Sequence, residues 1–330
     1  MHKTAIIMKF HSRLILLTVL SLAVTFSAEA RKPQNLRLLY WNIQNGMWSD
    51  QGNNYDNFVE FVKSQKPDIC VWAEGQSIYR TGTADRFEDS MDRYLVSNWD
   101  ELAARYGHTY VYIGGHRDDF PQVITSRYPV HNVERILGVR PDSVVCHGAG
   151  WATVEVGKCK LNIVTVHTWP QRYNYGIPVE DRARSGAAKE GDFYRAKEMK
   201  YICEHTILSE KADTSECWMM MGDFNAISSL DNGHYGYPAD TSAFLVHDYI
   251  LGNTPYRDAV WEEHGTDFQS TIISGRRLDF VYMTPALLKM MESADVLREG
   301  WVRNYRDPQH LSNFSHPSDH LPIVVDWKIY

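Results

Sequence analysis

The sequence predicts one α/β domain with mixed or antiparallel β-sheets. Short apolar runs rich in β-branched and aromatic residues recur along the chain, and Gly, Pro, Asn and Asp separate them. Several of these runs follow one another without an intervening helix, a pattern that all-parallel sheets do not allow. The 330 residues are 44% hydrophobic and 23% charged, which is typical of a globular protein.

The first thirty residues are set apart from this domain. Three basic residues precede an apolar run at positions 14–26, and Ala28-Glu29-Ala30 supplies a small-x-small cleavage pattern. The run is shorter than the roughly 20 residues that span a bilayer. We therefore predict a cleaved secretory signal peptide over residues 1–30. The mature chain, residues 31–330, is then a single exported domain, periplasmic or extracellular, with no transmembrane segment.

The first half of the chain alternates strands and helices. Helical spacing places Phe58, Phe61 and Val62 on one face of residues 55–62, and a second short helix is predicted at 102–106. Residues 150–169 form a β-hairpin that turns at Gly157. The predicted strands of this half lie at residues 36–43, 69–74, 109–115, 122–130 and in the two arms of the hairpin.

A long polar loop at residues 168–191 opens the second half. Residues 192–208 follow it as an amphipathic helix, with Asp192 as the expected N-cap. A short helix begins at Pro285. The predicted strands of this half lie at residues 217–225, 277–283 and 321–330.

The charge limits the kinds of partner. The chain carries a formal net charge of −7, so it has no general attraction to polyanions such as nucleic acid. A site that handles phosphate must therefore be made locally, most simply by a bound metal ion.

Five cysteines are too few to form a disulfide scaffold for a chain of this length. Cys146 and Cys159 flank the predicted hairpin, so one bridge between them is expected. Cys70 lies in an apolar strand and is expected to be free and buried.

Polar residues recur where the predicted strands end. The residue types are those that bind metals, hold phosphate or move protons. They are Asn42, Glu74, Arg127, His167, Asp223, Asn225, Asp279, Asp319 and His320. This recurrence predicts a site assembled at one edge of packed sheets.

Each residue type suits a different task. Mg²⁺ prefers oxygen ligands and needs only one or two carboxylates, which Glu74 can provide with the amide of Asn42. His320 can hold a proton near neutral pH when a carboxylate such as Asp279 orients it. Purely structural roles are the alternatives, because Asp223 and Asn225 also suit an Asx turn. Likewise, Asp279 can pair with a neighbouring arginine, Arg276 or Arg277, and His167 can be a core residue.

The ordered set of motifs resembles one known family. "WNIQNG", the glutamate after "PDICVW", "SRYPV", "TVHTW", "GDFN", "RLDFVY" and "SDHLP" occur in the order seen in the endonuclease/exonuclease/phosphatase superfamily. The resemblance covers nearly the whole mature chain. It implies a four-layer α/β sandwich of two packed mixed β-sheets flanked by helices. It also implies phosphate-ester hydrolysis with Mg²⁺ or Mn²⁺.

The resemblance implies a role for each strand-end residue. Asn42, Glu74 and Asp319 are metal residues, and the catalytic set is His167, Asp223, Asn225, Asp279 and His320. Arg127 is expected near the site as a charge or structural partner. The chain departs from the family pattern at Ala73, where a glutamine usually precedes the metal glutamate. Asp223 and the His320–Asp279 pair both remain candidates for the general base.

The substrate is less defined than the reaction. Two aromatic segments, residues 169–175 and 231–238, are expected to shape the pocket, with Trp169, Tyr173 and His234 as substrate-binding residues. The expected partner is a phosphate ester, from nucleic acid, nucleotide or sugar phosphate to phospholipid headgroup, and the protein is expected to be a monomer. We predict a phosphodiesterase. The alternatives are a phosphomonoesterase, a sphingomyelinase-like hydrolase and, last, an inactive binding protein.

Overall fold

Two six-stranded sheets form the centre of the computed structural model. The first sheet has the order β11 (Met291–Val296), β14 (Ile323–Ile329), β1 (Gln34–Asn42), β2 (Ile69–Ala73), β4 (Gln122–Ser126) and β3 (Tyr110–Gly114). The second has the order β5 (Val130–Ile136), β6 (Ala149–Val156), β7 (Cys159–His167), β8 (Cys217–Asp223), β10 (Asp279–Met283) and β9 (Arg257–Asp258). A separate two-stranded ribbon joins β12 (Tyr305–Arg306) to β13 (Ser315–His316).

The structure describes residues 34–76, 98–115, 120–138, 145–157, 159–170, 188–306 and 315–329. The predicted signal peptide and Tyr173 lie outside these ranges. Both sheets contain parallel and antiparallel pairs, so the prediction of mixed sheets is confirmed.

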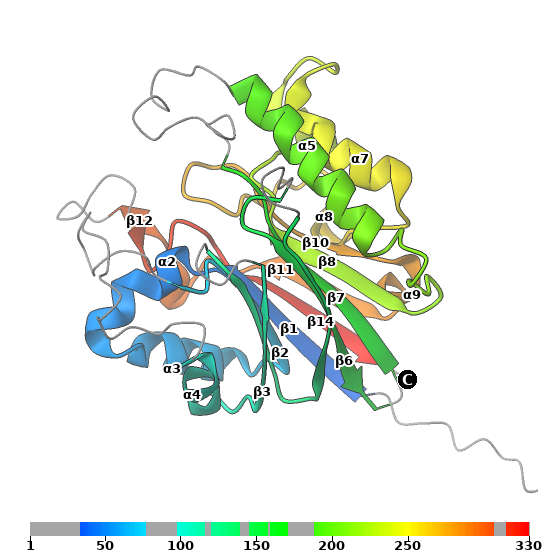
Figure 1. Cartoon of the computed structure of the whole chain (residues 1–330). Coiled ribbons are helices and arrows are strands. Elements are labelled where there is room, and N and C mark those ends of the chain that lie inside the picture. The colour runs from blue at the N-terminus through cyan, green and yellow to red at the C-terminus, as the bar shows by residue number, and fades with distance from the viewer. Residues whose placement is uncertain are drawn as a thin grey trace, which may run out of the picture. The chain divides into compact units, whose positions relative to one another are not determined.

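Helices cover the outer face of each sheet, which gives four layers (Figure 1). α3 (Asp56–Gln65) and α4 (Trp99–Arg105) pack on the first sheet, and α5 (Ala188–His205) and α7 (Leu245–Asn253) pack on the second. The smaller helices are α2 (Gln44–Met47), α6 (Asn232–Tyr235), α8 (Ala259–His264) and α9 (Pro285–Leu288). The predicted four-layer sandwich is therefore confirmed.

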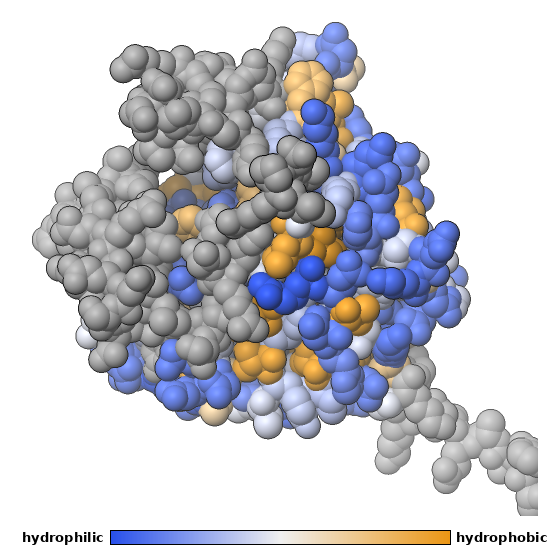
Figure 2. Space-filling model, viewed as in Figure 1, coloured by the Kyte–Doolittle hydropathy of each residue, from blue (hydrophilic) through white to orange (hydrophobic). Residues whose placement is uncertain are grey.

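Strand alternation explains how one sequence fills three apolar layers. In β1, Leu38 and Tyr40 face the second sheet, whereas Leu39 and Trp41 face the helices. Because successive side chains of a strand point to opposite faces, a strand covered on both sides must be apolar throughout. The coloured residues on the face seen in Figure 2 are mostly hydrophilic, with small hydrophobic patches between them. Among the described residues, no helix has the length and apolar character needed to cross a membrane.

Some predicted elements differ in detail. The run at residues 122–130 is divided by Tyr128 and Pro129, and its end begins a strand of the other sheet. α5 begins at Ala188, so Asp192 is not its N-cap; the Asp192 carboxylate accepts hydrogen bonds from Arg195 (2.5 Å) and Ser242 (2.7 Å) instead. The sequence patterns did not identify α7, α8 and β11.

The expected Cys146–Cys159 disulfide is wrong. In the β6–β7 hairpin Cys159 lies opposite Val156 at the turn, whereas Cys146 precedes Ala149 at the other end. An eight-residue strand separates the two positions by roughly 20 Å, far more than a disulfide can span. All five cysteines are free, and Cys159 lies close enough to Cys217 for the two thiols to shift each other's pKa, downward for Cys159 and upward for Cys217. Cys70 is fully buried in β2, as expected.

A buried arginine fixes the start of β10. Arg277 is 1% exposed, and its guanidinium donates to Asp231 Oδ2 (2.8 Å) and to both oxygens of Asp258 (3.2 and 2.6 Å). Asp258 also caps α8 by accepting the backbone N–H groups of Val260 and Trp261. The arginine therefore ties three segments together immediately before Asp279.

Replacing Arg277 should destabilise the fold. Arg277→Ala leaves two buried carboxylates without their cation, and we expect a loss of about 3–5 kcal/mol in the free energy of unfolding. Urea titration would measure it, with the exposed neighbour Arg257→Ala as the control. A loss below ~1 kcal/mol would show that the arginine does not hold these segments.

Candidate active site

Polar residues from both sheets meet at one end of the sandwich. β1 and β2 run parallel, so Asn42 and Glu74 leave the first sheet at the same edge. β7 and β8 also run parallel, with His167 opposite Asp223. Asp279 begins β10 opposite Asp223, because this pair is antiparallel. Asn42 Nδ2 lies 3.1 Å from Asp223 Oδ2, so the two edges are in contact.

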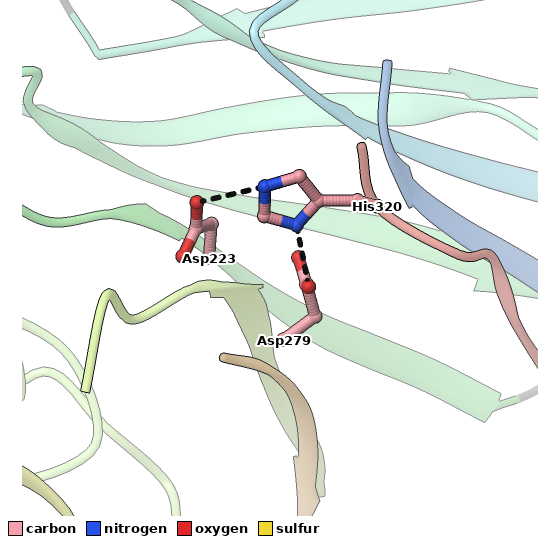
Figure 3. Close-up of side chains that lie close together, drawn as sticks. All are labelled: Asp223, Asp279 and His320. Atoms are coloured by element: carbon pink, nitrogen blue, oxygen red, sulfur yellow. Dashed lines mark hydrogen bonds and ion pairs between the residues drawn. The ribbon is translucent and has the colours of Figure 1, made fainter. Parts of the chain in front are cut away.

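His320 lies between two carboxylates at this edge (Figure 3). Its Nδ1 is 2.7 Å from Asp279 Oδ2, and its Nε2 is 3.7 Å from Asp223 Oδ2. Asp279 comes from β10, and His320 comes from the segment before β14, so the bond joins the two sheets. The structure thus brings together the pair that the sequence separates by forty positions.

Further hydrogen bonds hold this pair in place. Asp279 is fully buried, and its Oδ1 accepts the hydroxyl of Tyr40 (2.7 Å). Ser318 Oγ donates to the carbonyl of Asn42 (2.8 Å) and accepts the N–H of His320 (3.1 Å). Arg277 pairs with Asp231 and Asp258, so the alternative interpretation of Asp279 as its partner is wrong.

The carboxylates favour the charged form of the histidine. Burial alone lowers the pKa of His320, but Asp279, Asp319 and Asp223 outweigh it and raise that pKa well above its usual value. Burial raises the pKa of the Asp223 carboxyl to about 7; His320 opposes this shift and Asp279 adds to it. Since Nδ1 of His320 is bonded to Asp279, Nε2 is the ring nitrogen that can face a substrate.

A backbone N–H two residues further along the chain orients the side-chain amide of Asn42. Its Oδ1 accepts the N–H of Gln44 (3.0 Å), which can only donate, so the amide NH₂ must face the other way. That NH₂ donates to Glu74 Oε1 (3.3 Å) and to Asp223 Oδ2 (3.1 Å). Asn42 therefore bridges two carboxylates, and only the second lone pair of its Oδ1 remains for a metal ion.

Glu74 is half-buried and occupies a strained backbone position. Its φ of 54° lies in the left-handed region, which is uncommon for a residue with a side chain. Its Oε2 accepts the N–H of Asn45 (2.8 Å). Burial raises the pKa of Glu74, and Asp319 raises it further. Asn42 and Asn45 thus supply the support that Ala73 cannot give.

His167 faces Asp223 and stacks on a second histidine. His167 Nε2 is 3.8 Å from Asp223 Oδ2, and its ring lies on that of His147 at a centroid distance of 4.4 Å. Burial, and then the proximity of His147, lowers the pKa of His167 well below its usual value. The imidazole of His167 is therefore kept neutral, in contrast to that of His320.

Asn225 follows Asp223 in a tight turn. Its N–H donates to Asp223 Oδ1 (2.8 Å), and its Nδ2 donates to the carbonyl of Thr168 (3.0 Å). Its φ of 47° is in the left-handed region, which asparagine tolerates better than most residues. Asp223 and Asn225 therefore form the Asx turn and also lie at the candidate site. The turn brings Asn225 back toward β7.

The donor set fits a hard cation. Asp319 raises the pKa of Glu74, as expected for neighbouring like charges, and a cation between them would remove that repulsion. Asp223, Asp279 and His320 also offer ligand atoms within 4.8 Å of one another. Because His320 Nδ1 and Asp279 already bond each other, we interpret these three as a hydrogen-bonded network.

Three other predicted residues do not join this cluster. Arg127 pairs with Asp68 at the opposite end of the first sheet, because β4 runs antiparallel to β2. Trp169 is 8% exposed and packs edge-on to Tyr194. His234 stacks on Phe268 at 3.8 Å and lines a cavity of ≈ 350 Å³. The residues that line this cavity include none of the strand-end residues. The substrate-binding roles of Trp169 and His234 stay predictions.

The sequence patterns missed four residues of the site. Tyr40 and Asn45 lie beside Asn42 in the chain, Ser318 lies beside Asp319, and His147 precedes β6. The first three lie within or beside the quoted motifs, but their neighbours Asn42 and Asp319 carry the stronger sequence signal. His147 had no signal of its own, because only the fold brings it to His167.

Comparisons with known proteins agree with this architecture. A family model described as "Endonuclease/Exonuclease/phosphatase family" matches residues 39–320. An AP endonuclease from Archaeoglobus fulgidus superimposes with a TM-score of 0.57 at 16% identity, covering 89% of this chain and 100% of that one. A 3′–5′ exonuclease from Neisseria meningitidis superimposes with a TM-score of 0.54, also at 16% identity, covering 89% and 100%. D. rerio TDP2 complexed with a single-strand DNA product gives a TM-score of 0.51 at 14% identity, covering 90% and 100%. No curated protein sequence matches.

The bond between Tyr40 and Asp279 should be measurable as stability. Tyr40→Phe removes the donor and leaves a buried carboxylate oxygen unpaired, which should cost about 1–3 kcal/mol of unfolding free energy. Urea titration would measure it, with the exposed Tyr110→Phe as the matched control. Equal stabilities of the two variants would contradict the assignment of this bond.

Proposed function

Because the chain belongs to the endonuclease/exonuclease/phosphatase family, we propose that it is a divalent-metal-dependent phosphodiesterase. The observation that carries this proposal is the continuous network from Glu74 through Asn42 and Asp223 to His320 and Asp279. It combines a metal-binding carboxylate, a proton acceptor and a cationic donor within one buried edge. We also propose export, on the basis of the pattern in the first thirty residues.

Glu74 and Asp319 are the proposed metal residues, with Mg²⁺ or Mn²⁺ as the ion. When bound, the ion would neutralise charge on the phosphate oxygens and lower the pKa of water. Asn42 and Asn45 each hold one oxygen of the Glu74 carboxylate, which fixes its orientation and leaves a second lone pair on each oxygen for the ion. Its own Oδ1 retains one lone pair, which keeps the sequence-based assignment of Asn42 as a ligand in the proposal.

Asp223 is the proposed acceptor of the water proton. Three carboxylates surround His320 and favour its charged form, so the imidazolium is poorly suited to accept a proton. The carboxylate of Asp223 lies beside His320 Nε2, and its Oδ1 accepts the N–H of Asn225. This arrangement favours Asp223 over the His320–Asp279 pair, although the protons of such close groups belong to the network as a whole.

His320 is the proposed donor to the phosphate. Its Nε2 points away from Asp279, and a cation at this place stabilises the negative charge that develops in the transition state. Asn225 is proposed to contact the phosphate. The neutral His167, on the other side of Asp223, is suited to hydrogen-bond the substrate or to protonate the leaving oxygen.

A substrate panel tests the reaction and its metal requirement together. We expect hydrolysis of phosphodiesters in Mg²⁺ or Mn²⁺ and loss of activity in excess EDTA. Glu74→Gln should lower kcat/KM by at least ~10²-fold, because it removes the central charge from the metal site. The matched control is Glu204→Gln on the surface of α5. Full activity in EDTA would refute metal dependence, and activity on monoesters alone would favour the phosphomonoesterase alternative.

A double-mutant cycle tests the pairing of His320 with Asp279. His320→Ala should lower kcat by ~10²–10⁴-fold through loss of a charge-stabilising group. Asp279→Asn should cause a large part of the same loss, since Asp279 acts through the histidine. The double variant should therefore resemble His320→Ala. Multiplicative losses in kcat, with thermal melts showing folded protein, would mean that the two residues act independently.

A further inference from the structure

The rings of His147 and His167 form a stacked pair whose geometry the hairpin alone does not determine. Their interplanar angle is 25°, and the rings are 5% and 3% exposed. Phe120 lies edge-on to both, at 5.3 and 6.1 Å. The last paired positions of β6 and β7 are Ala149 and Val166, so both histidines lie beyond the end of the ladder.

The two chains separate where the ladder ends. The carbonyl of Ala149 accepts the N–H of Gly115, whereas the N–H of Thr168 donates to the carbonyl of Asp223. Cys146 and Trp169 therefore lie outside the β6–β7 ladder, and the N–H group of each needs an acceptor other than the facing strand, although both residues are buried. A buried N–H needs an acceptor, and this part of the hairpin must find one elsewhere.

One carboxylate from α5 satisfies both groups. Glu198 Oε1 accepts the N–H of Cys146 (2.8 Å), and Glu198 Oε2 accepts the N–H of Trp169 (2.9 Å). The side chain thus replaces a rung of the ladder and fixes the distance between the two segments. Cys146 is next to His147, and Trp169 is two residues after His167, so fixing the separation of the two segments also constrains the separation of the two imidazoles.

The helix that carries Glu198 holds the second segment twice. Arg195, one turn earlier on α5, donates to the carbonyls of Trp169 (3.2 Å) and Pro170 (3.1 Å). Residues three apart share a helix face, which directs both side chains to the same segment. Met199, Ile202 and Cys203 anchor the helix in the apolar layer above the second sheet.

Stability of the fold alone does not account for a carboxylate at position 198. It is fully buried, and burial raises its carboxyl pKa to about 7 although two N–H groups stabilise the charged form. A buried charge is weak support for a fold, and apolar replacements are often neutral or better. What this carboxylate provides is a defined spacing of two segments, one carrying His147 and the other carrying His167 opposite Asp223.

We propose that Glu198 is a positioning residue, whose carboxylate spaces the two segments so that His147 stacks on His167 and His167 faces Asp223. The part of this inference that concerns catalysis depends on the function proposed above. The geometric part does not, and the experiment separates the two.

Histidine ring NMR tests the geometry without substrate. In Glu198→Ala, the ring signals of His147 and His167 should move, because each loses the ring-current shift of its neighbour. The signals of His247 and His108, which are buried and bonded elsewhere, should stay. Glu204→Gln, on the exposed side of the same helix, should leave all four unchanged. If Glu198→Ala does not fold, Glu198→Gln keeps the volume and should give the same pattern of shifts.

Kinetics on bis(p-nitrophenyl) phosphate with Mg²⁺ tests the consequence. Misplacing a catalytic group by about 1 Å costs up to ~10²-fold, so Glu198→Ala should lower kcat ~10–100-fold and leave KM within about twofold. Unmoved signals of His147 and His167, or equal movement of all four histidines, would overturn the proposal. Moved signals with unchanged kcat would overturn its catalytic part. An inactive wild-type protein would count against the proposed function, while the NMR result would still decide the geometry.

Discussion

The hydrogen bond between His320 and Asp279 joins the two sheets at the place where their polar residues gather. Asp279 begins β10 of the second sheet, His320 lies in the segment that leads into β14 of the first, and Tyr40, from β1 of the first sheet, reaches the same carboxylate. At 2.7 Å, both bonds need the sheets to be packed in one register. The apolar layer between the sheets sets that register, so the core determines the geometry of a site built from polar side chains.

Strand direction decides which strand-end residues belong to the site. The sequence predicted Asn42, Glu74, His167 and Asp223 because each follows a buried run, and the parallel pairs β1–β2 and β7–β8 place them at one edge. The same rule failed for Arg127, because β4 runs the other way and ends at the far edge. A sequence pattern identifies where a strand stops, but it does not reveal the strand's direction in the sheet.

The strands of the central sheets were predictable from their residue pattern, whereas the four-layer arrangement was implied by the family resemblance. Strands covered on both faces, such as β1, β2 and β8, are continuous apolar runs and are easily recognised. β11 alternates buried and exposed residues at the edge of its sheet and gives a weak signal. Glu198 and His147 carry no local pattern at all. Glu198 lies in a helix of ordinary composition, and only the packing of α5 brings its carboxylate to the hairpin.

The site contains groups that are unfavourable for the stability of the fold. The carboxylates of half-buried Glu74 and of buried Asp223 and Asp279 gather at one edge, and desolvation disfavours the ionised forms of Glu74 and Asp223. Glu74 and Asn225 also hold left-handed backbone positions without being glycine. A sequence selected for stability alone would replace such residues with apolar or neutral ones. Their presence in one network fits the proposed phosphate-ester hydrolysis, in which gathered carboxylates would hold a cation and His320 would face the phosphate.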